Sequence, residues 1–296
     1  MQDVWHLMQQ QPWFFLLSVG LTSACIGSFL NVVIYRLPKM MENEWKSECK
    51  VILGQHDQSS EQSASHSSSF NLITPRSTCP SCDTQIKAHH NIPILSWLLL
   101  KGRCAYCSTS ISVRYPCIEM LTAAASLWVA WHFGATFTAL LYIVMTWGLI
   151  ALIFIDIDKM LLPDQLTQPM LWLAIISAVL GLTITVEAAI WGAVAGYLSL
   201  WSVYWLFKLL TGKEGMGYGD FKLLAIFGAL LGWQALITII LLSSVVGAVI
   251  GSIQLAMQGK DKATPIPFGP YLAIAGWLCL FYGDALKIWY LNLLGV

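Results

Sequence analysis

Residues 137–155 read FTALLYIVMTWGLIALIFI, a continuous apolar run that contains no charged side chain. An α-helix needs about 20 consecutive apolar residues to cross the hydrocarbon core of a bilayer, and this run has that length. Further runs of the same kind occur at about 13–35, 116–134, 166–185, 187–208, 220–232, 234–256 and 267–284. The pattern predicts an all-α polytopic membrane protein with about eight transmembrane helices, and the short sixth helix should pack inside the bundle or tilt little.

The composition supports this class. The chain of 296 residues is 57% hydrophobic and only 11% charged, whereas a soluble domain of this size carries about 25% charged residues. The first run is too long for the core of a signal peptide and no small-residue cleavage site follows it, so we expect it to be retained as a span. The net charge of zero indicates no polyanionic partner, which argues against a nucleic-acid-binding protein.

The positions of the Lys and Arg residues predict the orientation. With an even number of spans, both termini lie on the same side of the membrane. Of the 16 basic residues, only Lys287 falls on the side of the termini, and the others lie in, or just inside, the segments that connect the spans on the opposite side. The positive-inside rule places these connecting segments in the cytoplasm and both termini outside.

One stretch is long enough to form a second domain. Residues 36–114 form a polar insert, predicted to be cytoplasmic, between the first transmembrane helix, 1–35, and a membrane domain of seven helices, 115–296. Within the insert, residues 54–69 read GQHDQSSEQSASHSSS, a Ser- and Gln-rich composition that is typical of disorder.

The insert contains two CxxC pairs, Cys79-Pro-Ser-Cys82 and, after 21 intervening residues, Cys104-Ala-Tyr-Cys107. Each pair bends the chain so that two thiolates converge, and four thiolates suit a tetrahedral zinc ion. A reducing cytoplasm favours zinc over disulfides, and a disulfide-linked or redox CxxC pair is the alternative. Four protein ligands leave no open coordination position, so the zinc ion should be structural.

Acidic residues in membrane helices are costly and usually functional. Asp156 directly follows the run 137–155, and Asp158 lies two residues further on, on roughly the other side of the helix. Asp220 ends the glycine-rich stretch GMGYGD (215–220), where the sixth run begins. The predicted topology places Asp156 and Asp220 at the same membrane depth, where they can meet if the two helices pack together.

Two facing carboxylates indicate acid–base chemistry on a peptide bond. Like charges close together share one proton, so one group can activate a water molecule while the other protonates the scissile carbonyl and later the leaving amine. Structural interpretations remain: Asp220 can cap its helix, and Asp156 or Asp158 can pair with Lys159 or Lys222. A proton-coupled transporter is a further interpretation, which the spacing of the acids does not separate from a peptidase.

Several longer motifs occur in a fixed order along nearly the whole chain. They are GSFLNVVIYRLP (27–38), the two CxxC pairs, NIPILSWLLLKGRC (91–104), YPCIE (115–119), IDIDKMLLPD (155–164) and GMGYGDFKLLA (215–225). In this order the set resembles the bacterial type IV prepilin peptidases, which are bifunctional leader peptidase/N-methyltransferases of the GxGD membrane aspartyl protease class.

The resemblance implies that Asp156 and Asp220 are the catalytic aspartates, with Asp158 as the alternative to Asp156. It implies a multi-pass protein of the bacterial inner membrane with periplasmic termini. Such enzymes cut the basic leader of type IV prepilins and type II secretion pseudopilins on the cytoplasmic side, after a glycine and before a usually aromatic residue. They then methylate the new N-terminal amine with S-adenosylmethionine. No GxGxxG-like fingerprint marks a methyl-donor site, and the resemblance alone assigns methylation to the zinc-bearing domain.

Two other functions stay open from the sequence. One is a peptidase without methyltransferase activity, and the other is a non-catalytic membrane transporter or assembly scaffold with a zinc domain. Some residues of the matched motifs have structural roles as an equal alternative to functional ones: Gly27, Asn31, Arg36, Gly102, Arg103 and Glu119.

Overall fold

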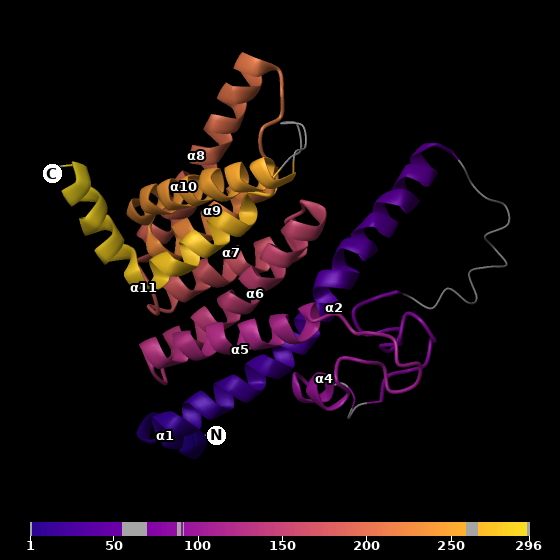
Figure 1. Ribbon diagram of the computed structural model, residues 1–296. Helices are drawn as coiled ribbons and strands as arrows, with labels where there is room; N and C mark the ends of the chain where they lie inside the picture. The colour runs from indigo at the N-terminus through magenta and orange to yellow at the C-terminus, as the bar shows by residue number, and fades with distance from the viewer. Residues whose placement is uncertain (1, 55–69, 88–89, 91, 259–265, 295–296) are drawn as a thin grey trace. The chain divides into compact units, whose positions relative to one another are not determined.

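The computed structural model describes residues 2–54, 70–87, 90, 92–258 and 266–294. These residues form ten helices and no strand, which confirms the all-α class (Figure 1). They group into two compact units, Met1–Ala135 and Thr136–Val296. The stretch 54–69, for which the sequence predicts disorder, lies outside the described residues except for Gly54.

The helices follow the predicted apolar runs. They are α1 (Gln2–Gln10), α2 (Pro12–Ile52), α4 (Leu95–Leu99), α5 (Arg114–Phe133), α6 (Phe137–Lys159), α7 (Asp164–Val179), α8 (Val186–Thr211), α9 (Tyr218–Leu231), α10 (Trp233–Gln258) and α11 (Gly269–Leu294). Each of the eight predicted runs forms one helix, namely α2 and α5 to α11. Four of these, α2, α6, α8 and α10, contain a stretch long and apolar enough to cross a membrane. The total of eight spans stays a prediction.

Helix α2 is longer than the predicted first span. It passes through Pro38 and ends at Ile52, whereas the sequence analysis ended the first transmembrane helix at residue 35. Hydropathy falls at Arg36, but the residues that follow are good helix formers, so the helix continues beyond the apolar run. The first part of the predicted polar insert is therefore helical.

In the first unit, α2 and α5 pack against each other. The backbones approach closely at Gly27, because a Cβ atom there would lie 2.8 Å from Cα of Glu119. One turn further along α2, the Asn31 side-chain amide donates to the backbone oxygen of Tyr115 at 3.2 Å. A small residue and a polar bond thus join the two helices, as is common between membrane helices.

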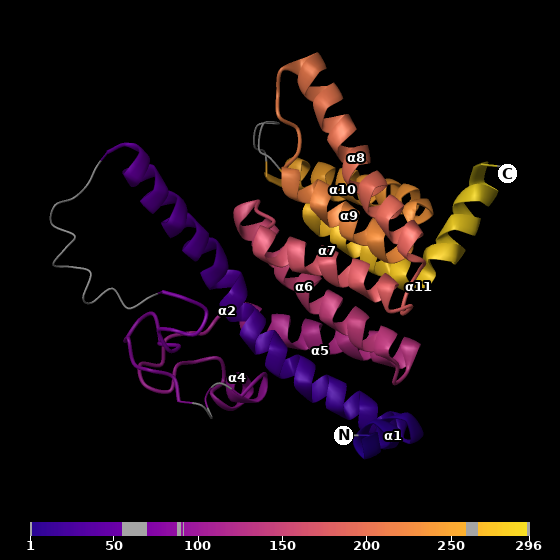
Figure 2. The same ribbon diagram turned by 180° about the vertical axis from the view of Figure 1, so that it is seen from behind.

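In the second unit, α9 is the central helix. It packs against α7, α8, α10 and α11, a group of helices that Figures 1 and 2 show from opposite sides. All residues from Asp220 to Leu230 are buried except Lys222, which is partly exposed. Such burial on every side is typical of a core helix rather than of a helix that faces lipid.

Glycines bring α8 and α9 into backbone contact. A Cβ atom at Gly192 of α8 would collide with the backbone of Gly228 of α9, and one at Gly196 would lie 2.7 Å from the Leu224 oxygen. Gly192 and Gly196 are one helical turn apart, so both face α9. This is the small-xxx-small pattern that allows close helix packing in membranes.

Candidate active site and metal centre

The four cysteines of the CxxC pairs come together in the first unit. The Sγ atoms of Cys79, Cys82, Cys104 and Cys107 all lie within 4.8 Å of one another, and those of Cys79 and Cys107 are 3.7 Å apart. Tetrahedral zinc with Zn–S bonds of about 2.3 Å separates its sulfur ligands by about 3.8 Å. The donor set and its spacing therefore fit a metal ion of this kind.

The two CxxC turns have the same backbone hydrogen bonds. Cys79 N–H donates to the Thr84 oxygen, and Asp83 N–H donates back to the Cys79 oxygen. In the second turn the Cys104 N–H donates to the Thr109 oxygen, and the Ser108 N–H donates to the Cys104 oxygen. The residue four positions after the first cysteine of each pair has a positive φ angle, 51° at Asp83 and 57° at Ser108. The cysteines are thus presented by two matching tight turns.

Local hydrogen bonds prepare one thiol for metal binding. The Thr109 hydroxyl lies 3.3 Å from Cys107 Sγ. Hydrogen bonds from the Thr109 side chain and backbone lower the pKa of Cys107 to about 6. The thiolate is the form that binds metal, and the neighbouring thiol of Cys79 has its pKa raised to about 11, so the four cysteines influence one another as a cluster.

The cysteine-bearing segment is fastened to α2 by Arg36. Its guanidinium group donates to the backbone oxygens of Asn71 at 3.0 Å and Pro75 at 2.7 Å, and lies 5.6 Å from the centre of the Phe70 ring. Arg36 is only 9% exposed. A structural role, one of the two alternatives from the sequence, accounts for these contacts.

Glu119 fastens the same segment to α5. Its Oε2 atom accepts a hydrogen bond of 2.7 Å from the backbone N–H of Ile94. Ile94 has a φ angle of +59°, which is costly for a β-branched residue. A buried carboxylate thus holds a strained turn directly before α4, and Glu119 also acts in the structure rather than as an isolated acid.

In the second unit, the structure brings Asp156 and Asp220 together. Asp156 lies in the last turn of α6 and Asp220 in the first turn of α9, and their side chains are close enough to interact electrostatically. They are 5% and 6% exposed. Within the described residues, Asp156 Oδ2 and Asp220 Oδ1 have no hydrogen-bond partner. The two buried carboxyl groups thus lie near each other, and each has one oxygen without a partner.

The structure bears on two of the structural alternatives for these acids. The N-cap of α9 is Gly217, which has no side-chain cap, and the Asp220 carboxyl group accepts a hydrogen bond from the Gly217 backbone N–H, so Asp220 also serves the start of its helix. Lys222 pairs with Asp164 at 2.5 Å, and not with Asp156. Asp158, two residues beyond Asp156, is exposed. Of these two acids, only Asp156 is buried beside Asp220, whereas Asp158 is exposed.

Two residues beside the aspartates were not among the predicted site residues, although one of them, Leu162, lies in the motif 155–164. A Cβ atom at Gly269, the first residue of α11, would lie 2.5 Å from Asp156 Oδ2. Leu162, in the connection between α6 and α7, contacts Gly219, the residue before Asp220. The sequence signal at Gly269 is the Pro-Phe-Gly-Pro stretch 267–270, which precedes the last apolar run.

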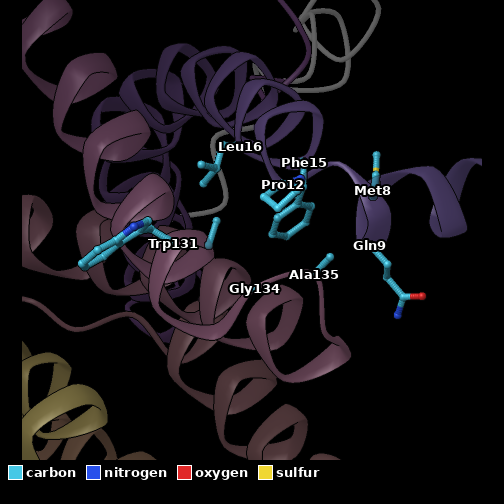
Figure 3. A pocket seen from close by; sticks show the side chains of 9 residues that line it. Met8, Gln9, Pro12, Phe15, Leu16, Trp131, Gly134 and Ala135 are labelled. Atoms are coloured by element: carbon cyan, nitrogen blue, oxygen red, sulfur yellow. The ribbon is translucent and has the colours of Figure 1, made fainter.

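A separate cavity lies in the first unit, between the α1–α2 corner and the end of α5 (Figure 3). Its volume is about 310 Å³, and its lining includes Met8, Phe15, Leu16 and Trp131. No acidic, basic, histidine, cysteine or tyrosine side chain lines it. It is therefore no candidate for acid–base chemistry or metal binding.

Two family models and several named proteins match this chain. Residues 21–133 match the bacterial peptidase A24 N-terminal domain, and residues 143–252 match the type IV leader peptidase family. The chain is 53% identical to a prepilin leader peptidase/N-methyltransferase of Stutzerimonas stutzeri, over 97% of both chains. It is 50% identical to the protein of the same name from Pseudomonas aeruginosa, over 97% of both chains, and 52% identical to that from Aeromonas hydrophila, over 95% of both.

No solved structure matches the chain. The relatives are similar over nearly their whole length, and the two family matches together cover both the cysteine-bearing unit and the unit with the buried aspartates. The chain belongs to the type IV leader peptidase family.

Proposed function

We propose that this protein is a membrane aspartic endopeptidase and N-methyltransferase that processes type IV prepilins and type II secretion pseudopilins. It removes the basic leader at the cytoplasmic face of the inner membrane and then methylates the new N-terminal amine. The names of its relatives support both activities. The observation that carries the peptidase assignment is the pair of buried carboxyl groups, Asp156 and Asp220, on separate helices.

The aspartate pair can perform peptide hydrolysis by shared-proton chemistry. One ionised carboxylate accepts a proton from water, which attacks the scissile carbonyl carbon, and the protonated partner donates to the carbonyl oxygen. Collapse of the tetrahedral intermediate breaks the C–N bond, and a proton passes to the leaving amine. The unpartnered oxygens Asp156 Oδ2 and Asp220 Oδ1 are free for these transfers. The exposure of Asp158 supports Asp156 as the first acid.

Zinc bound by Cys79, Cys82, Cys104 and Cys107 has a structural role in this proposal. Four thiolates saturate a tetrahedral ion, so no position is open for substrate. Among the described residues of 70–113, α4 is a helix of five residues and most of the others lie outside helices. Metal binding supplies folding free energy to such small domains. S-adenosylmethionine supplies the methyl group, which the N-methyltransferase name of the relatives supports.

The expected orientation places the aspartate pair and the cysteine domain at the cytoplasmic face, with both termini in the periplasm. The distribution of Lys and Arg supports it. A prepilin with a basic leader and an apolar helix would place its cleavage site at this same depth, because the positive leader stays in the cytoplasm.

The test is a cleavage assay with purified protein in detergent and a prepilin, with and without S-adenosylmethionine. Mass spectrometry of the product N-terminus separates cleavage from methylation. We expect wild type to produce a methylated N-terminus, Asp156→Asn and Asp220→Asn to leave the prepilin intact, and Asp158→Asn to retain cleavage as the matched control.

Two results would contradict the proposal in different ways. Cleavage by the Asp156→Asn/Asp220→Asn double variant would remove the aspartate pair from the mechanism. Cleavage by wild type without added methyl groups would leave a peptidase that lacks the second activity. If wild type cleaves no prepilin, the transporter or scaffold interpretation takes its place.

A further inference from the structure

We propose that Gly269 and Leu162 are positioning residues for the aspartate pair, and that together they fix the separation of the two carboxyl groups. This inference rests on the proposed role of Asp156 and Asp220 in cleavage. It concerns the start of α11, which lies outside the quoted motifs, and Leu162, which lies within the motif 155–164 but has no role in the chemistry above.

The first contact is between α11 and Asp156. A Cβ atom at Gly269 would lie 2.5 Å from Asp156 Oδ2 and 3.2 Å from its Cγ. The backbone N–H of Gly269 also interacts with this carboxyl group. Asp156 Oδ2, though buried, has no hydrogen-bond partner among the described residues. The bare backbone of Gly269 therefore forms one wall of the space in which that oxygen lies.

The second contact links this wall to Asp220. A Cβ atom at Gly219 would lie 2.5 Å from Cβ of Leu162, and one at Gly269 would lie 3.2 Å from Cδ1 of Leu162. The Leu162 side chain therefore touches the glycine beside each aspartate. Three chain segments, from α6–α7, α9 and α11, meet at this one side chain.

Backbone N–H groups and packing, and not a cation, hold the two carboxyl groups in place: Gly269 bonds to Asp156 and Gly217 bonds to Asp220. Among the described residues, neither Asp156 nor Asp220 takes part in a salt bridge, and the neighbouring Lys222 is paired with Asp164. A carboxyl group without a cation or a hydrogen bond on its free oxygen is positioned by the atoms that surround it. The backbone of Gly269 and the side chain of Leu162 supply such surrounding atoms for Asp156 and Asp220.

The size of the effect follows from the distances. A methyl carbon at 2.5 Å from Oδ2 is about 1 Å closer than ordinary van der Waals contact, which begins at 3.4 Å. Either the carboxyl group or the start of α11 must move by that amount. A misplacement of about 1 Å at a reacting group can lower the rate about 100-fold.

The test compares Gly269→Ala with Gly283→Ala, the same change in the same helix at a position where a Cβ atom meets nothing within 4 Å. For prepilin cleavage we expect Gly269→Ala to lower kcat about 100-fold, with KM little changed and a shifted pH–rate profile. Gly283→Ala should match wild type in kcat, in KM and in its pH–rate profile. Equal kcat and pH profiles for the two variants would overturn the inference.

A second pair of variants covers the case in which Gly269→Ala does not fold, as judged by thermal unfolding in detergent. Leu162→Ala removes the side chain between the two glycines, whereas Leu162→Met conserves its volume. We expect a lower kcat for Leu162→Ala than for Leu162→Met, and equal values would refute a positioning role.

The same assay separates this inference from the proposed function. If Asp220→Asn is inactive while Gly269→Ala and Leu162→Ala cleave normally, only the positioning role fails. If Asp156→Asn/Asp220→Asn still cleaves, the proposed function fails, whatever the Gly269 variant does.

Discussion

Arg36 should hold the start of the cysteine-bearing segment against α2, and its substitution gives a graded prediction. The buried guanidinium group donates to two backbone oxygens, those of Asn71 and Pro75. Lys in its place has a single ammonium group without the planar fork, so it can retain one of these bonds but not the geometry of both. Ala retains neither bond.

The expected magnitude follows from the number of bonds lost. A hydrogen bond to a charged group contributes about 1.5–3 kcal/mol. Arg36→Lys, which loses one bond, should raise the local opening of the segment about 10- to 100-fold, since about 1.4 kcal/mol corresponds to a factor of ten. Arg36→Ala should raise it further, although the two bonds share a side chain and need not add.

Hydrogen–deuterium exchange with mass spectrometry measures this opening. The amides of Ile73 and Thr74 donate to Asn71 Oδ1 at 2.8 and 2.6 Å, so they exchange only when the turn opens. Lys39→Ala is the matched control, because Lys39 is an exposed cation that also lies near the Phe70 ring. Equal exchange in wild type, Arg36→Lys and Arg36→Ala would refute the reasoning.

Three further predictions concern the metal, the packing of α8 on α9, and one ion pair. Cys104→Ser should lose the zinc that wild type binds at about one equivalent, measured by metal analysis of the purified protein, and unchanged zinc content would exclude the four-thiolate site. Gly228→Ala should lower the free energy of unfolding by about 1–3 kcal/mol through overpacking against Gly192, and a melting temperature in detergent equal to that of wild type would contradict the backbone contact. A hydrogen bond from Lys208 lowers the pKa of Glu214, so this pair should contribute stability above the unfolded-state pKa of about 4.3 and lose it as the pH falls through the lower pKa of the folded state. The melting temperatures of wild type and Glu214→Gln should therefore converge below about pH 4, and a constant difference down to pH 3 would disprove the coupling.

The helices could be predicted because their signal is local. Continuous apolar runs gave α2 and α5 to α11 as helices, with ends that differ by several residues. The extension of α2 past Pro38 could not be predicted from hydropathy, which reports where apolar character ends and not where helical backbone ends. Proline usually disrupts a helix, and here the helix nevertheless continues to Ile52. Residues 42–52 are exposed, so their helix-forming composition rather than packing accounts for the extension.

The candidate site was predictable only where its signal is local in the sequence. The CxxC spacing places four thiolates near one another by local geometry, and topology alone put Asp156 and Asp220 at one depth. The packing of Gly269 and Leu162 around the aspartates depends on contacts between segments about 50 to 110 residues apart. Hydrophobic periodicity contains no information about such contacts, and the Pro-Phe-Gly-Pro stretch at 267–270 is only a turn signal when viewed alone.

The burial of α9 also bears on how the protein is made. With 14 residues, α9 is about 21 Å long, shorter than the hydrocarbon core of about 30 Å. A segment so short, with an acid at its first turn, cannot settle in the lipid by itself during synthesis. We expect it to be stable there only against a partner helix, and the glycine face of α8, which precedes it in the chain, packs directly on it. We therefore expect a bulky substitution at Gly192 or Gly196 of α8 to displace α9, and so to disturb the aspartate pair without contacting either acid.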